Sequence, residues 1–298
     1  MSVQKSTLAP AGGESMESDP RHGTENEPRE KARGRSRTSM ARGPEKVTRV
    51  PFGLLGLLGL VAIWVVAAHG GLVDDKWLPG PVELITHTWS LATDGYRGTP
   101  LATHVLVSMR RTAIGFLLAV VLGVPIGLAM GRYRPVGALL GPTFALLRPI
   151  PPIAFIPLAV LYLGLGEASK IVLIFLAPFM FIVLNAEAGV RSVSSSWIRA
   201  GQMLGFSRRQ LFTRVILPGS LPSIMVGVRT GAAVSWALVV AAELISAQEG
   251  LGYMVASAGN FFDLETVYAG IFLIGIIGFL LDIAARKVEN RLLHWQGR

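Results

Sequence analysis

Long apolar segments dominate this sequence from residue 51 onward and constrain its fold more than any other feature. A helix needs about 20 predominantly apolar residues to cross the hydrocarbon core of a bilayer. Six stretches of about that length follow one another, at residues 51–73, 108–131, 136–165, 170–190, 218–246 and 264–285. They predict an all-α membrane protein with six transmembrane helices, in which residues 47–298 form one domain.

The composition supports the same class. Hydrophobic residues make up 51% of the chain and charged residues only 16%, whereas soluble domains carry roughly 25% charged residues. The net charge is +9, but the basic residues lie in an N-terminal tail and in short gaps between apolar segments. That distribution indicates membrane topology. The sequence therefore predicts a lipid bilayer as its surroundings and no nucleic-acid partner.

The flanking charges predict the orientation. Residues 31–49 contain seven basic residues, so this end is expected in the cytoplasm. Residues 1–46 nearly lack large apolar side chains, which predicts a disordered basic tail. Six crossings return the C-terminus to the cytoplasm together with the arginine-rich segment 191–217, and leave segments 73–104 and 247–265 as outer loops. Arg110 and Arg111 are exceptions at the outer end of the second span; they either snorkel to the interface or line a polar cavity.

The segment RAGQMLGFSRRQLFTRVILP, residues 199–218, contains four arginines and no acid. Ser194 is expected to cap a first helix, Gly205 to end it, and Ser207 with Gln210 to form the capping box of a second. Leu217-Pro218 is expected to stop that second helix. Such a helix–turn–helix either docks a partner protein or lies on anionic lipid.

The spacing of this segment resembles the "EAA" loop of the permease subunits of ABC importers. That pattern is EAA, three residues, Gly, nine residues, Ile, one residue, Leu-Pro. The matching residues are Arg199, Ala200, Gly201, Gly205, Val215, Leu217 and Pro218. Two departures matter, because Arg199 replaces the usual Glu and Gly201 the second Ala, whereas Val215 in place of Ile is conservative.

The resemblance implies a type I ABC importer permease fold with both termini cytoplasmic, in a bacterial inner membrane. It implies a homodimer of multi-pass permeases, two cytoplasmic ATPase subunits that bind the loop 191–217, and an external solute-binding protein. ATP and Mg would be bound by the ATPase and no cofactor by this chain. The coupling residues would be the seven above and Ser207.

Two further stretches are similar to the branch of this family that imports aliphatic sulfonates, taurine or nitrate. They are LRPIPPIAFIPLAVLYLGLGEASKI, residues 147–171, and VAAELISAQEGLGYMV, residues 240–255. The resemblance implies alkanesulfonate import, with taurine, nitrate or another small anion or metabolite as alternatives. An ion-coupled secondary transporter is the alternative class, but it usually needs paired intramembrane ion sites, and only Glu243 qualifies.

The sequence has no His, Cys or metal-ligand constellation that would indicate catalysis. It has no cysteine, and its five histidines are scattered without metal-ligand spacing. The nearest approach to a phosphate-binding loop is GLGEASK, residues 164–170, whose spacing differs from the G-x-x-x-x-G-K-[ST] pattern. The sequence therefore predicts no catalytic residue and no metal site, so the chain is not expected to be an enzyme.

Charged residues at membrane depth are costly and point to function. Arg148, Arg229 and Glu243 are candidates for lining a translocation pathway, with Arg110 and Arg111 as lesser ones. The alternative for Arg148 and Arg229 is a structural pair with a carboxylate. The run RPIPP, residues 148–152, cannot hold a regular helix, so Pro149 and Pro151 mark either the pathway or a packing kink.

The run EGLG, residues 249–252, is a turn signal. Gly250 and Gly252 are therefore gate candidates, and an ordinary surface loop is the alternative. Small residues within 115–127 are expected to let helices approach closely.

Overall fold

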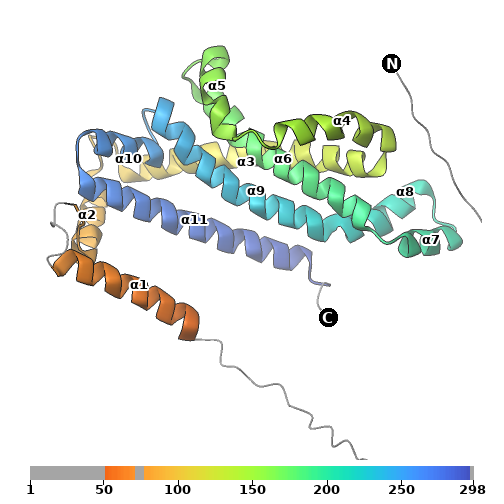
Figure 1. Cartoon of the computed structure of the whole chain (residues 1–298), viewed down its shortest axis with the longest axis horizontal. Coiled ribbons are helices and arrows are strands. Elements are labelled where there is room, and N and C mark those ends of the chain that lie inside the picture. The colour runs from red at the N-terminus through yellow and green to blue at the C-terminus, as the bar shows by residue number, and fades with distance from the viewer. Residues whose placement is uncertain (1–50, 71–76, 296–298) are drawn as a thin grey trace, which may run out of the picture. The chain divides into compact units, whose positions relative to one another are not determined.

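The computed structural model describes residues 51–70 and 77–295 of the 298-residue chain. The tail predicted at residues 1–46 lies outside these residues. Their regular structure is helical (Figure 1), apart from an isolated bridge between Tyr96 and Thr99. The all-α prediction is therefore confirmed for the part of the chain that the structure describes.

Eleven α-helices succeed one another in these residues. Their bounds are α1 Pro51–His69, α2 Pro81–Asp94, α3 Leu101–Arg132, α4 Arg134–Leu147, α5 Ile156–Leu163, α6 Glu167–Ser192, α7 Ser195–Met203, α8 Arg208–Leu211, α9 Leu217–Ser246, α10 Leu251–Asn260 and α11 Leu264–Leu292. A short 3₁₀ helix, Pro152–Phe155, precedes α5, and a π-helical segment, Phe212–Ile216, joins α8 to α9.

Four described helices are long and apolar enough to cross a membrane. They are α3, α6, the continuous run Arg208–Ile245, and α11. The bent pair of α4 with the 3₁₀ helix and α5 makes a fifth if it is counted as one span. The described part of α1 adds a shorter apolar helix, Leu58–His69.

Helix α6 packs against both α3 and α9 along much of its length, whereas α3 and α9 contact each other over a shorter stretch. Small residues on α3 make this possible. A Cβ added at Gly115 would lie 2.7 Å from Ile174 Cγ2, and one added at Gly123 would lie 3.0 Å from Ile182 Cγ2. The expectation that 115–127 serves close helix packing is therefore confirmed, and α6 is the helix that it contacts.

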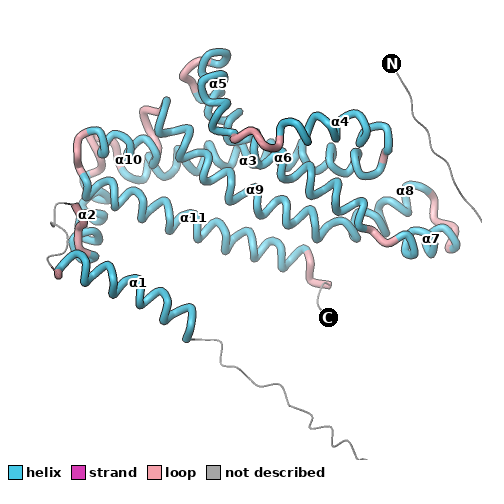
Figure 2. Tube along the Cα trace, in the orientation of Figure 1, coloured by secondary structure: helices cyan, strands magenta, loops and turns pink. Residues whose placement is uncertain are grey.

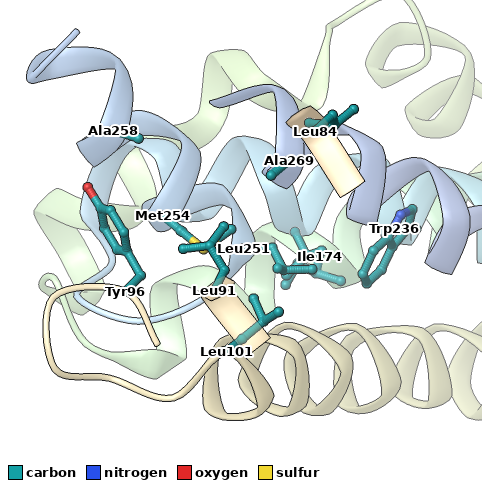
Figure 3. Close-up of a cluster of buried hydrophobic side chains, with 11 residues drawn as sticks. Leu84, Leu91, Tyr96, Leu101, Ile174, Trp236, Leu251, Met254, Ala258 and Ala269 are labelled. Atoms are coloured by element: carbon teal, nitrogen blue, oxygen red, sulfur yellow. The ribbon is translucent and has the colours of Figure 1, made fainter. Parts of the chain in front are cut away.

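A second apolar cluster lies where α2 and α10 meet the long helices (Figure 3). Its buried side chains include Leu84 and Leu91 of α2, Leu251 and Met254 of α10, and Trp236 of α9, which Figure 3 labels. The expected outer loops 73–104 and 247–265 thus each contain a helix, which the sequence analysis missed. With 14 and 10 residues, both helices are shorter than the roughly 20 residues of a membrane span.

The expected third span, 136–165, is not one straight helix. Helix α4 ends at Leu147, and the chain turns through residues 148–151, drawn as a loop in Figure 2, before the 3₁₀ helix and α5. The two halves are bent by 90°. Prolines at 149, 151 and 152 remove backbone donors and clash with the preceding turn, as expected for RPIPP.

The prediction that Leu217-Pro218 stops the helix after Ser207 is wrong. Helix α8, the π segment and α9 form one uninterrupted helix from Arg208 to Ile245, here called the rod. Pro218 has no N–H, and the turn before it widens so that the Leu217 N–H donates to the Phe212 carbonyl. A π turn of this kind accommodates a local mismatch without breaking the helix.

Candidate functional site

The helical hairpin of α7 and α8, residues 194–211, forms at one end of the long helices (Figure 1). Ser194 caps α7 by accepting a hydrogen bond from the Ser196 N–H at 3.2 Å. Gly205 follows α7 with φ +73°. The Gly205 N–H donates to the Gln202 carbonyl and the Phe206 N–H to the Gly201 carbonyl, each at 3.0 Å. These two bonds define a Schellman motif, which makes the turn sharp.

A capping box starts α8. The Gln210 N–H donates to Ser207 Oγ at 3.3 Å, and the Ser207 N–H donates to Gln210 Oε1 at 2.9 Å. Leu211 is buried against the first helix, because a Cβ at Gly201 would lie 2.8 Å from Leu211 Cδ1. Each arm of the hairpin is therefore tied to the turn by hydrogen bonds and to the other arm by packing.

A groove runs beside this hairpin. Its lining includes Ala200, Gly201, Val215 and Pro218, which are four of the predicted coupling residues. Trp197 contributes to the same groove and is 71% exposed. Arg199 is exposed, and within the described residues its guanidinium makes one polar contact, a 3.4 Å hydrogen bond to Ser196 Oγ. The hairpin thus has an apolar groove and an exposed guanidinium on its surface.

Three pathway candidates lie together at the bend between α4 and α5. Arg148, Pro149 and Pro151 line one pocket with Asn185 of α6. The remaining wall comes from apolar side chains of α6 and the bend, namely Ile150, Pro152, Ala177, Met180, Phe181 and Leu184. A single cation beside an amide in an apolar wall is a setting suited to weak anion binding.

Arg229 lies elsewhere, in contact with α11. Its Nε donates to Asp282 Oδ1 at 3.0 Å, and its Nη1 lies 3.4 Å from Glu289 Oε2. Asp282 also pairs with Arg286 one turn further along α11. This geometry is the ion-paired arrangement that the sequence left open as the alternative to a pathway role.

Glu243 is fully buried at the other end of the bundle and pairs with Arg111 of α3. Arg111 Nη1 lies 2.7 Å from Glu243 Oε1. The same guanidinium donates twice to Glu167 at the start of α6, from Nε at 2.9 Å and from Nη2 at 2.5 Å. We call these three residues the Arg111 cluster. It joins α3, α6 and α9 through one guanidinium that is only 4% exposed.

The EGLG turn is held by the same helices. The N–H groups of Gly250, Leu251 and Gly252 donate to His104 Nδ1, Ser108 Oγ and Glu243 Oε2, at distances of 3.1, 2.9 and 3.0 Å. The carbonyl of residue 249 accepts from Arg111 Nη1 at 2.7 Å. Ser108 also donates to the Glu243 carboxylate. The backbone of the turn is therefore satisfied by side chains of α3 and α9.

Both gate candidates have no room for a side chain. Gly250 has φ +121°, and a Cβ there would collide with the Glu243 carboxylate. A Cβ at Gly252 would lie 2.6 Å from the Val240 carbonyl oxygen. The two glycines let the turn close over the Arg111 cluster.

The sequence did not single out four polar residues of these sites. His104, Ser108 and Glu167 lie around the Arg111 cluster and the EGLG turn, and Asn185 lies in the Arg148 pocket. Each is a polar residue inside or at the edge of an apolar segment, which was the available signal. No group of three or more metal-ligating side chains occurs among the described residues.

Long apolar helices and a proline-broken span indicate an integral membrane protein, and a capped hairpin lies at one end of the long helices. The sequence model described as "Binding-protein-dependent transport system inner membrane component" matches residues 119–294, more than half of the chain. The chain belongs to this family. It is the permease subunit of an ABC importer, an inner-membrane transport component, and not a catalytic enzyme.

Curated relatives support this assignment. The taurine transport system permease protein TauC of Escherichia coli (strain K12) is 43% identical over 80% of this chain and 87% of that protein. A putative aliphatic sulfonates transport permease protein, SsuC of Bacillus subtilis (strain 168), is 35% identical over 82% of this chain and 87% of that protein. The nitrate import permease protein NrtB of Synechococcus elongatus is 27% identical over 88% and 93%.

Solved structures share the fold. An inward-facing structure of the MetNI methionine ABC transporter superposes with a TM-score of 0.55 at 21% identity, covering 64% of this chain and 95% of that chain. An amino acid ABC transporter crystallised with histidines gives a TM-score of 0.51 at 13% identity, covering 70% and 94%.

Proposed function

We propose that this permease imports small organosulfonates, and that ATP-driven movement enters the membrane through the hairpin of α7 and α8. The substrate class rests on the relatives that carry taurine and sulfonate names. Nitrate is the competing anion, because NrtB is similar over a comparable length but at lower identity. Family membership gives no support to the ion-coupled alternative.

The rod is the observation that carries the coupling role. It begins at Arg208, inside the hairpin, and continues to Ile245, two residues past Glu243. At 1.5 Å per residue, its 38 residues span about 57 Å. A displacement of the hairpin therefore reaches the EGLG turn through a single helix. The capped turn at Gly205 and the packing of Leu211 favour transmission of that displacement over local bending.

The family implies the rest of the assembly. We propose two copies of this chain with six spans each, both termini in the cytoplasm, two ATPase subunits on the hairpins and an external solute-binding protein. ATP and Mg belong to the ATPase. The coupling residues are Arg199, Ala200, Gly201, Gly205, Ser207, Val215, Leu217 and Pro218.

Within the membrane, we place the anion pathway at the pocket of Arg148 and Asn185. Glu243 and Arg229 are assigned to structural pairs, because they form ion pairs with Arg111 and Asp282. Gly250 and Gly252 act as gate residues by keeping the EGLG turn seated on the Arg111 cluster.

The test of transport uses the complete complex in proteoliposomes, with the binding protein outside and ATP inside. We expect ATP-dependent uptake of labelled taurine or ethanesulfonate, and no competition from excess nitrate. Complexes carrying Gly205→Pro should bind the solute-binding protein but lose ATP-dependent uptake, since proline cannot adopt φ +73°. Uptake that persists without the ATPase would overturn the proposal.

The orientation has its own test, because the chain contains no cysteine. A cysteine at Gln202 on α7 should react with a membrane-impermeant maleimide only after the cells are permeabilised. A cysteine at Asn260 on α10 should react in intact cells. The opposite pattern would reverse the proposed topology.

A further inference from the structure

We propose that a pocket between the C-terminal end of α3 and the start of the rod binds the phosphate of an anionic phospholipid. Three arginines line this pocket: Arg132 of α3, and Arg208 and Arg209 of α8. The other lining residues are Pro125, Leu128, Ala129, Tyr133 and Phe212, and the pocket encloses about 980 Å³. The assignment of this end to the cytoplasmic leaflet rests on the proposed topology.

The three guanidiniums have no counter-charge in the part of the chain that the structure describes. Within the described residues, no carboxylate lies within 4.0 Å of Arg132, Arg208 or Arg209. The sequence explains this, because it has no acid between Asp94 and Glu167 or between Glu187 and Glu243. Like charges that share one pocket repel each other unless an anion joins them. Guanidinium groups form bidentate hydrogen bonds with phosphate oxygens.

The apolar side of the pocket distinguishes a lipid from a free anion. Pro125, Leu128 and Ala129 belong to a helix long and apolar enough to span the membrane. Val121 and Leu117 lie one and two helical turns before Pro125 on the same face of α3, and they are 63% and 58% exposed. Together these residues form an apolar stripe on that face. From Leu117 to Arg132 this stripe runs about 22 Å, which exceeds the roughly 15 Å of one leaflet's hydrocarbon. An acyl chain fits this track, whereas inorganic phosphate would leave it uncovered.

Aromatic residues mark the expected depth. The Arg132 guanidinium lies 5.6 Å from the centre of the Tyr133 ring, and tyrosine is enriched at membrane–water interfaces. Basic pockets between membrane helices on the cytoplasmic side are typical sites for anionic headgroups. The pocket also shares no lining residue with the hairpin groove proposed for the ATPase. A lipid bound there would connect α3 to the start of the rod without occupying the ATPase groove.

The test is lipid retention by the purified complex, measured by native mass spectrometry with phosphatidylglycerol and phosphatidylcholine as probes. We expect the wild-type complex to keep phosphatidylglycerol in preference to phosphatidylcholine. Each basic residue near an anionic surface contributes roughly five-fold to binding, so the triple variant Arg132→Gln/Arg208→Gln/Arg209→Gln should bind phosphatidylglycerol about 100-fold more weakly. The corresponding triple lysine variant should keep most of the affinity.

The matched control removes three charges from the same end outside the pocket. Arg134→Gln/Lys287→Gln/Arg291→Gln changes residues that are exposed and line none of the pockets described above. Its phosphatidylglycerol affinity should stay within a few-fold of wild type. Equal losses in the two glutamine triples, or equal retention of both lipids by the wild type, would overturn the proposal.

Two further outcomes assign the pocket differently. Displacement of phosphatidylglycerol by millimolar inorganic phosphate would make it a site for a soluble anion. Loss of the ATPase from the pocket triple, with lipid retention unchanged, would make it a protein contact; either result contradicts the lipid assignment. A wild-type complex that retains the lipid but shows no ATP-dependent uptake would instead sink the proposed function alone.

Discussion

The charged side chains at the two ends of the helix bundle have opposite environments. At the α10 end, Arg111 is buried and fully engaged by Glu167, Glu243 and the backbone carbonyl of residue 249. At the hairpin end, Arg199 and the arginines of the pocket beside α8 are partly or wholly exposed and meet no described carboxylate.

This difference distinguishes charges that hold the helices together from charges that are available to bind other molecules. A buried ion pair that satisfies every donor fixes one arrangement of the helices that it joins. Exposed arginines without acids fix nothing within the chain and are available to partners. The rod connects the two ends, and in the proposed mechanism it carries displacement of the hairpin to the buried cluster.

Removal of the Arg111 guanidinium should give the largest effect. Arg111→Met leaves the buried Glu243 carboxylate without its counter-charge, which typically costs about 3–5 kcal/mol. Thermal unfolding of the purified complex should therefore begin at a clearly lower temperature. The matched control is Arg110→Met, because the Arg110 side chain is 61% exposed and contacts Glu167 at the longer distance of 3.5 Å. The loss of unfolding free energy in this variant should stay below about 1 kcal/mol. Equal costs would show that burial does not decide the value of these contacts.

A methyl group at Gly205 should give the next largest effect. A non-glycine residue at positive φ costs roughly 1–2 kcal/mol, and no atom lies within 4 Å of a Cβ at this position. Gly98, at the α10 end, is a matched control with φ +80° and equally open surroundings. Both alanine variants should lose similar stability in denaturation, but only Gly205→Ala should lower substrate-stimulated ATP hydrolysis. If Gly98→Ala lowers substrate-stimulated ATP hydrolysis as much, the loss follows from reduced stability and not from a specific role of the hairpin.

Charge reversal at Arg199 should have a smaller effect that is specific to assembly. Because this side chain is exposed, Arg199→Glu should leave the unfolding temperature unchanged and weaken co-isolation of the ATPase several-fold, as expected for loss of an exposed pair worth up to about 1 kcal/mol. Arg134→Glu, on an exposed arginine outside the hairpin, is the control. Tighter co-isolation of the ATPase with the Arg199 variant would mean that the partner surface is basic, as in the common form of the motif.

The smallest effect is expected for Gly201→Ala, which restores the alanine of the family pattern. The new Cβ would meet Leu211 Cδ1 at 2.8 Å, and the end of a leucine side chain can move to make room. The change in unfolding free energy should be below about 1 kcal/mol, with ATP hydrolysis unaltered. A larger loss in chemical denaturation would show that the hairpin arms cannot separate slightly.

The sequence predicted the elements that depend on local chemistry. The caps at Ser194 and Ser207, the positive φ at Gly205 and the break at RPIPP follow from neighbouring residues alone, and the structure has all four. Leu217-Pro218 failed as a stop signal because a π turn relieved the proline clash.

The Arg111 cluster could not be predicted in the same way. Arg111 and Glu243 are 132 residues apart in the sequence, and each alone was only a charge in an apolar setting. Their partnership depends on the packing of α3, α6 and α9, and on the closure of the EGLG turn over them. Long-range pairs of this kind need the tertiary arrangement before their role can be inferred.

The central claim is that the rod moves as one body between the hairpin and the EGLG turn. Because the chain has no cysteine, spin labels can be placed at Thr213 and Ile245, both exposed, in complexes diluted with unlabelled permease. Their backbones should be about 48 Å apart. The account predicts the same distance by pulsed electron paramagnetic resonance in nucleotide-free and ATP-bound complexes. A change of more than about one helical turn, 5.4 Å, would show that the rod bends between the two labels and would contradict the account.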